Sequence, residues 1–234
     1  MDKFLVSKKA ARLIVLQRIE LISSSLKRVR KIFGRFIFSN FITKFFINEK
    51  LIGESYHDIM INEFSTIEKF INKEDNLFLS IGGGLGGLEL MINKKFDNRN
   101  YYFIERNFIS KKVKYGWGGM TNSEAYNDLN LQKNFLETNG LKNEQINIYD
   151  YDKDDLPNIK FDLVISLLSL DYHYDFDIYI NYLKNISTPN TKIIFDTIRA
   201  DHFKSIFKNV EIIKTYDDTV HKSKRIMCSH FIDL

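Results

Sequence analysis

Residues 79–89 read Leu-Ser-Ile-Gly-Gly-Gly-Leu-Gly-Gly-Leu-Glu, an apolar segment that runs into a glycine-rich loop. Glycine adopts positive φ and lets the backbone approach a ligand more closely than any Cβ allows. A helix that starts after the loop offers unpaired N–H groups at its N-terminus. A plain tight turn between a strand and a helix would use the same residues. The segment predicts a strand–loop–helix unit, and its candidate ligand contacts are Gly82, Gly83, Gly84 and Gly86.

From Leu77 onward, short apolar runs alternate with amphipathic stretches, which is the pattern of β–α–β units around a parallel sheet. The candidate strands are 77–81, 100–104, 146–149, 161–167, 192–196, 210–216 and 225–232. Helical spacing falls between them at 86–95, 122–139, 175–186 and 200–208. The sequence therefore predicts an α/β fold with a Rossmann-like, seven-stranded, mostly parallel sheet.

The last two candidate strands are separated only by residues 217–224. This connection is too short for a crossover helix, so the two strands should pair as an antiparallel hairpin. A terminal hairpin distinguishes this sheet from the six-stranded parallel sheet of dinucleotide-binding domains.

The first 75 residues have a different pattern of apolar residues. Apolar positions recur at helical spacing over residues 3–32 and 54–71, and a phenylalanine-rich segment at 33–47 lies between them. A polar run at 72–76 closes this section. We expect two parts: a basic helical extension at 1–75 and a Rossmann-like domain at 76–234.

The positive charge of the chain is concentrated at its N-terminus. Residues 1–50 carry 12 Lys and Arg against 3 Asp and Glu, whereas the remaining residues carry 22 against 27. Three interpretations are open: helices that cap the active site, a basic amphipathic surface for anionic lipid, or a phosphate-binding surface for nucleic acid. Nucleic acid is the least favoured partner, and the sequence leaves the oligomeric state open.

The single cysteine, Cys228, excludes an intramolecular disulfide framework and is expected to be buried in the last strand. No window approaches the roughly 20 apolar residues of a membrane span. Charged residues interrupt residues 1–22, so they lack the apolar stretch of a signal peptide. We expect a cytoplasmic protein that can lie at the inner face of the membrane.

The spacing Gly82-x-Gly84-x-Gly86 resembles the first motif of class I S-adenosylmethionine-dependent methyltransferases, in which this loop wraps the methionine part of the cofactor. The family usually carries an acidic residue two positions before the first glycine, and here that residue is Ser80. A hydroxyl can still accept a hydrogen bond, so Ser80 stays a candidate cofactor contact, with a weaker interaction toward the cofactor's ammonium group.

An acidic residue, Glu105, ends the second strand 23 residues after Gly82, where it could hold two ribose hydroxyls. An exposed acidic residue at a strand end is the alternative. The resemblance also places Asp150 at the adenine amino group, with Tyr151 beside the ring, and Ser166 at the end of the strand that matches the family's fourth motif. The acidic run at 150–155 could instead form a solvated loop, and we expect no metal site.

Asp171 and His173, which both follow the fourth strand, are the candidate catalytic pair. A histidine can take the proton from a substrate hydroxyl, and Asp171 could orient it or bind substrate. A structural histidine packed between Tyr172 and Tyr174 is nearly as good an interpretation. Arg199, after the fifth strand, could bind an anionic group or form a surface salt bridge.

The motifs Tyr115-Gly116-Trp117 and Ala125-Tyr126-Asn127, with the segment 172–174, resemble sugar O-methyltransferases associated with surface polysaccharides. Trp117 could be a lid over the site or a core residue. The resemblance implies transfer of a methyl group from S-adenosylmethionine to an oxygen acceptor, a small molecule or a glycan hydroxyl. Alternatives are an RNA or protein methyltransferase, a non-catalytic Rossmann module, and an NAD-dependent enzyme.

Overall fold

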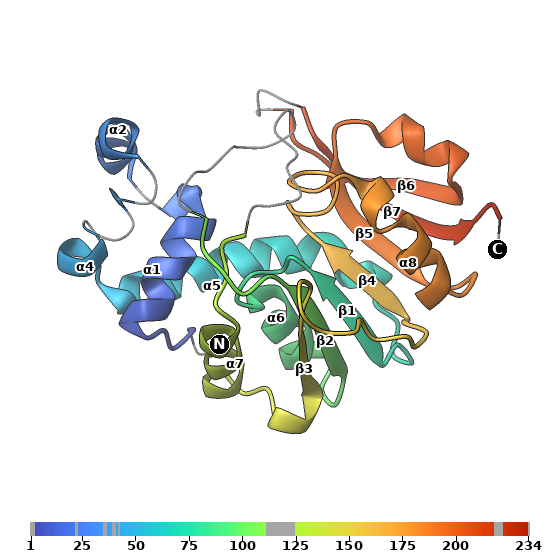
Figure 1. Ribbon diagram of the computed structural model, residues 1–234, viewed down its shortest axis with the longest axis horizontal. Helices are drawn as coiled ribbons and strands as arrows, with labels where there is room; N and C mark the ends of the chain where they lie inside the picture. The colour runs from blue at the N-terminus through green and yellow to red at the C-terminus, as the bar shows by residue number, and fades with distance from the viewer. Residues whose placement is uncertain are drawn as a thin grey trace.

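A seven-stranded sheet forms the centre of the computed structural model, which describes residues 3–21, 23–34, 37, 38, 41, 43–110, 125–217 and 222–233 (Figure 1). The strand order is β3-β2-β1-β4-β5-β7-β6. Their bounds are β1 Leu77–Ile81, β2 Asn100–Glu105, β3 Ile146–Asp150, β4 Leu163–Ser166, β5 Lys192–Thr197, β6 Phe207–Thr215 and β7 Lys224–Phe231. The predicted fold class is confirmed.

The first five strands are parallel, and the order reverses between β1 and β4. At such a switch point the connections leave in opposite directions, which opens a crevice at the carboxyl ends of the strands. The predicted terminal hairpin is also confirmed, because β7 pairs antiparallel with both β5 and β6. Cys228 is buried in β7, opposite Ile193.

Alternate residues of the strands supply two separate cores, as the side-chain period of a strand requires. Phe78 and Ile165 face the core formed with α6 (Gly87–Lys95) and α7 (Leu129–Thr138). Leu79 and Val164 face the core formed with α8 (Ile180–Ile186) and the 3₁₀ helices η6 (Phe176–Ile178) and η7 (Ala200–Ser205). The sheet is thus covered on both faces.

The N-terminal helices belong to the first of these cores. Buried residues of α1 (Lys8–Gln17) and α5 (Glu49–Ile67) share one apolar cluster with α6, α7 and the sheet. Ser7 and Asn48 start the two helices by accepting hydrogen bonds from first-turn N–H groups. Helices α1 and α5 therefore pack directly on the Rossmann-like part. No described helix has the length and apolar character needed to cross a bilayer.

The remaining N-terminal elements are η1 (Ile19–Leu21), α2 (Ser24–Phe33), α4 (Thr43–Phe46) and η3 (Glu68–Phe70). Figure 1 shows α2 and α4 at one end of the molecule, away from the sheet. η5 (Asn143–Gln145) leads into β3.

Helix boundaries differ from the predicted ones where a side chain caps the backbone. The predicted helix at 122–139 begins only at Leu129, because Asp128 accepts a hydrogen bond from Leu131 N at 3.0 Å. The preceding Tyr126 is extended and pairs with Ile109. The predicted helix at 175–186 is divided into η6 and α8, and that at 200–208 is the short η7.

A buried ion-pair network joins the N-terminal part to the sheet. The Arg225 guanidinium on β7 is fully buried and donates to both carboxylate oxygens of Asp196 on β5, at 2.9 and 3.1 Å. It also donates to Glu63 and Thr66 on α5, at 2.6 and 2.7 Å. Removing one member of a buried ion pair is costly, because the partner that remains is a buried charge without compensation.

We therefore expect Arg225→Ala to lower the free energy of unfolding by about 3–5 kcal/mol, measured by urea denaturation. Lys204→Ala is the matched control, because it breaks an exposed ion pair with Asp201 and should cost less than about 1 kcal/mol. Equal effects of the two substitutions would contradict a structural role for the network.

Candidate functional site

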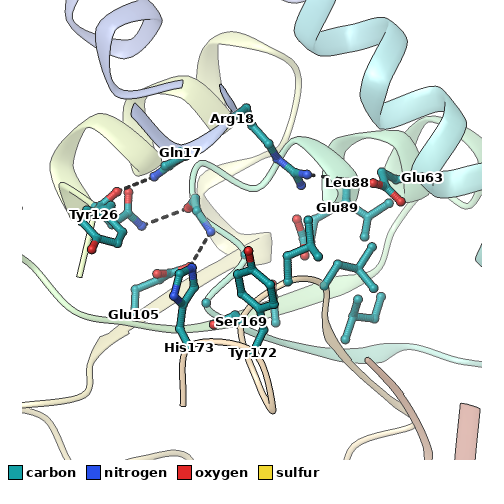
Figure 2. Close-up of a pocket in the computed structure, with 18 of the residues that line it drawn as sticks. Gln17, Arg18, Glu63, Leu88, Glu89, Glu105, Tyr126, Ser169, Tyr172 and His173 are labelled. Atoms are coloured by element: carbon teal, nitrogen blue, oxygen red, sulfur yellow. Dashed lines mark hydrogen bonds and ion pairs between the residues drawn. The ribbon is translucent and has the colours of Figure 1, made fainter. Parts of the chain in front are cut away.

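A cavity of about 200 Å³ lies at the carboxyl ends of β1, β2 and β4, next to the switch point. Several parts of the chain line it: the glycine loop at 82–84, the start of α6, the end of β2, residues 125–127, most of the segment 167–174 after β4, and residues of the N-terminal part. Figure 2 shows labelled side chains of the N-terminal part, of α6, of the end of β2 and of the segment after β4 around one space.

The glycines divide into two groups with different roles. Gly82 (φ +66°) and Gly84 (φ +68°) line the cavity, and a Cβ on them would lie 1.9 Å from Ser169 Oγ and 2.8 Å from Gln17 Oε1. Gly86 (φ +82°) starts α6, and a Cβ there would lie 2.7 Å from Leu136. Gly82 and Gly84 thus allow close approach at the site, whereas Gly86 allows close packing of helices.

Glu105, at the end of β2, lies in the cavity as predicted. Its Oε1 accepts a hydrogen bond from Gly84 N at 2.7 Å, and Asn127 donates to the carbonyl of Gly84 at 2.9 Å. Burial raises the pKa of Glu105 to about 8, although hydrogen bonds from Gly84 and Asn127 favour the ionised form. The glycine loop is thereby fixed to a carboxylate in a low-dielectric environment.

A second buried carboxylate, Glu89, lies in the first turn of α6, and the sequence analysis did not identify it. Glu89 and Ser80 both line the cavity, behind Gly83. Burial raises the pKa of Glu89, and the charge of Arg18 partly opposes the shift. Its position between Leu88 and Leu90, in a helix with an otherwise apolar first half, is the sequence signal that could have found it.

The segment after β4 is held in an uncommon conformation. Leu168 (φ +55°) and Asp171 (φ +57°) are both left-handed, which costs energy for residues with a Cβ. The Asp171 carboxylate is buried and accepts from Thr197 Oγ1 at 2.6 Å and from Arg199 Nε and Nη2 at 2.9 and 2.5 Å. Asp171 therefore fastens the segment to the end of β5, and it is not among the described residues that line the cavity.

His173 does line the cavity, opposite the glycine loop (Figure 2). Its ring packs edge-on against Tyr172, with 4.6 Å between centroids, and at 6.1 Å from Tyr126. Its backbone N donates to Ser169 O at 2.7 Å. Of the two candidate catalytic residues, the structure places only this one against the cavity.

Three other predicted cofactor contacts lie outside the described lining. The Asp150 carboxylate accepts a hydrogen bond from Asp152 N at 3.2 Å, within the turn that follows β3. The Tyr151 ring lies 4.9 Å from the Arg106 guanidinium, which does line the cavity. Ser166 is buried and donates to Ile81 O at 2.6 Å, which ties β4 to β1. Trp117 and its neighbouring glycines fall outside the described residues.

The N-terminal part contributes a wall of the cavity that the motif analysis did not identify. Gln17, at the end of α1, lies over the glycine loop and donates to Tyr126 O at 2.6 Å. Arg18 follows it, and Tyr56 of α5 packs against Gly87. These residues reach the site through helix packing, so no local spacing in the sequence marks them.

Comparison with known proteins gives a likeness of fold. The sequence matches no protein-family model and no curated protein. A protein from Nostoc punctiforme PCC 73102 that is assigned as an O-methyltransferase superposes with a TM-score of 0.50 at 12% identity, over 76% of this chain and 61% of that chain.

Two further structures are similar at lower scores. Mitomycin 7-O-methyltransferase gives a TM-score of 0.47 at 13% identity, over 88% of this chain and 66% of that chain. Magnesium protoporphyrin IX methyltransferase from Synechocystis PCC 6803 gives 0.44 at 16% identity, over 93% and 97%. This chain spans less than two-thirds of the length of the two O-methyltransferases. The Nostoc likeness is one of fold, and it agrees with the predicted Rossmann-like, seven-stranded sheet.

The raised pKa of Glu105 has a consequence for stability. Folded Glu105 keeps its proton up to a pH of about 8, whereas the unfolded chain loses it near 4.5. The contribution of Glu105 to the free energy of unfolding is therefore fully present below pH 4.5 and is lost as the pH rises to about 8. We expect the wild type to lose stability relative to Glu105→Gln between about pH 5 and about pH 8, measured by urea unfolding. Glu137→Gln, an exposed change on α7, should leave the pH profile unchanged. Identical profiles for wild type and Glu105→Gln would refute the assignment.

Proposed function

We propose that this protein is an S-adenosylmethionine-dependent methyltransferase that acts on an oxygen acceptor, with a sugar or glycan hydroxyl as the favoured class. One observation carries the proposal: at the switch point of the sheet, a glycine loop, buried carboxylates and a histidine line one cavity.

The charge of the cavity favours a cationic cofactor. Among the described lining residues, three acidic side chains, Glu20, Glu63 and Glu89, outnumber the two guanidinium groups, those of Arg18 and Arg106, and Glu105 is protonated below a pH of about 8. A sulfonium ion is attracted by such a site, whereas the diphosphate of NAD would meet like charge. Moreover, Gly84 N already donates to Glu105, so this N–H is not available to cradle a phosphate.

The residues present fit the proposed cofactor. Gly82, Gly83 and Gly84 line the cavity with backbone alone, and Glu105 provides an acceptor at the strand end where ribose hydroxyls would bind. What the cofactor supplies is a methyl group on a positively charged sulfur. The protein then needs only to align the acceptor and to accept a proton.

The acceptor side of the cavity supports a hydroxylated substrate. His173 lies there with Tyr126, Tyr172 and Tyr174, whose rings combine apolar surface with polar tips. A neutral imidazole can accept the proton that a hydroxyl loses as it becomes a nucleophile. Asp171 supports this arrangement from behind by holding the segment, through Thr197 and Arg199.

Calorimetric titration tests the cofactor. We expect S-adenosylmethionine and S-adenosylhomocysteine to bind the purified protein, and NAD to give no heat above dilution, because Gly84 N already donates to Glu105 and cannot receive a phosphate. Binding of NAD alone would overturn the proposal. If none of the three compounds binds, a non-catalytic binding module is favoured.

The histidine is tested by methyl transfer from radiolabelled S-adenosylmethionine to nucleotide sugars and glycans. Loss of a general base lowers rates by about 10²–10⁴-fold. We expect His173→Ala to show such a loss with unchanged binding of S-adenosylhomocysteine. His202→Ala, on the exposed surface of η7, is the matched control. Full activity of His173→Ala would remove the histidine from the mechanism.

We also propose that an anionic membrane surface binds the outer face of α2 and α4. Cationic and large apolar side chains interleave there, with Ile32 78% and Phe45 62% exposed. Exposed side chains of this basic apolar surface are Arg28, Lys31, Ile32, Phe33, Ile37, Phe41, Lys44 and Phe45. Such a combination suits the boundary between acidic headgroups and acyl chains.

Vesicle co-sedimentation tests the basic apolar surface. We expect binding to phosphatidylglycerol vesicles that weakens with salt, weak binding to phosphatidylcholine vesicles, and loss on Phe33→Ser with Phe45→Ser. Lys153→Glu, an exposed charge change after β3, is the control. If neither vesicle binds and the protein is a dimer that these substitutions dissociate, the surface is covered by a second copy and the membrane proposal is wrong.

A further inference from the structure

The buried carboxylate of Glu89 lacks a partner at one of its oxygens. Glu89 is 2% exposed, and its Oε2 is among the described buried atoms that have no hydrogen-bond partner, as is Ser80 Oγ. A Cβ on Gly83 would lie 2.2 Å from Ser80 Oγ and 3.3 Å from Glu89 Oε1. The unsatisfied groups therefore lie directly behind the glycine loop, at the wall of the cavity.

Burial of a carboxylate without a partner is costly, and native structures satisfy such groups. The position of Glu89 in the first turn of α6 offsets part of this cost, since the helix N-terminus is positive. Among the described residues, the acidic groups Glu20, Glu63, Glu89 and Asp196 outnumber by one the cations that act on them, Arg18, Arg225 and Lys214. The site therefore lacks one positive charge.

Arg18 lies close enough to Glu89 to influence it electrostatically, and its side chain is 16% exposed at the cavity (Figure 2). Both of its ion pairs use Nη1, at 3.3 Å to Glu20 and 3.9 Å to Glu63. These are long contacts for a guanidinium, which can bind a carboxylate through two parallel hydrogen bonds. Arg18 can therefore bind an additional anionic group.

We propose that Glu89 and Arg18 together bind the α-amino-acid end of the ligand, with Glu89 receiving the ammonium and Arg18 the carboxylate. This inference rests on the proposed function, because S-adenosylmethionine carries such an end. It gives the N-terminal extension a direct role in cofactor recognition.

The pairing also accounts for Ser80. An acidic residue at position 80 would place a second carboxylate beside Glu89, behind Gly83. Two buried carboxylates at this separation cannot both ionise without a large penalty. With the acidic group supplied from α6, a small hydroxyl on β1 is the compatible neighbour. The carboxylate has thus moved from the strand to the helix.

The test compares two probes that differ only in this end. S-Adenosylhomocysteine carries the amino acid, whereas 5′-methylthioadenosine is the corresponding nucleoside thioether without it. By titration calorimetry we expect Glu89→Gln and Arg18→Ala to weaken S-adenosylhomocysteine binding by about 10- to 100-fold, the loss of one charge-assisted contact. Binding of 5′-methylthioadenosine should be unchanged, which also reports that the variants are folded. Glu137→Gln should alter neither.

A double variant that moves the carboxylate from α6 to β1 provides an independent check. Ser80→Asp combined with Glu89→Ser returns the carboxylate to the strand, and it should recover most of the S-adenosylhomocysteine affinity that Glu89→Ser loses. Ser80→Asp alone should destabilise the protein through the paired carboxylates.

The outcomes separate the inference from the proposed function. If the wild type binds neither probe, the methyltransferase proposal fails and this inference fails with it. If the wild type binds S-adenosylhomocysteine and Glu89→Gln binds it equally well, only the inference is wrong. Loss of both probes in Glu89→Gln would also overturn it, since Glu89 would then shape the cavity without reading the amino acid.

Discussion

The hydrogen bond from Gly84 N to Glu105 governs the geometry of the whole site. It fixes the glycine loop of β1 to the end of β2 and keeps a carboxylate buried beside the cavity. With the loop in this position, the absence of a Cβ on Gly82 and Gly84 leaves the space that the Ser169 and Gln17 side chains occupy. Segments from three regions of the chain therefore meet at a loop whose position one short contact sets.

The N-terminal part of the chain is integral to this arrangement. Helices α1 and α5 share an apolar cluster with α6, α7 and the sheet, so the core and the cavity wall form from the same packing. The buried Arg225 network adds an electrostatic connection, since it joins Glu63 of α5 to Asp196 of β5. Displacement of α5 would thus both expose apolar surface and leave charges unpaired.

Sequence reasoning predicted the parts of the structure that depend on local pattern. Strand alternation, the terminal hairpin and the glycine loop follow from spacing alone, and Glu105 follows from its distance after Gly82. Arg18 and Gln17 could not be predicted in this way, because their side chains reach the cavity through helix packing. Glu89 was missed although an acidic residue between two leucines in the first turn of a helix is a local signal. Asp171 was predicted as a catalytic partner from its proximity to His173 in sequence, yet its carboxylate is bound by Thr197 and Arg199. The left-handed backbone at Asp171, which no sequence period reveals, sets that direction.

Glycine loops after a first strand serve both anionic and cationic cofactors, so the loop by itself does not distinguish them. The distinction lies in what surrounds the loop N–H groups. Where those groups are free, the helix N-terminus attracts a phosphate. Here a buried carboxylate accepts from Gly84, and a second one, Glu89, lies behind Gly83 with an unsatisfied oxygen. Glu105 stays protonated below a pH of about 8, so it blocks the Gly84 N–H from a phosphate without adding charge. An ionised Glu89 in this low-dielectric wall would attract a cation more strongly than the same charge would in water. Under the proposed function, the residues that occupy the phosphate position of the loop would therefore be the ones that receive a sulfonium with an ammonium group.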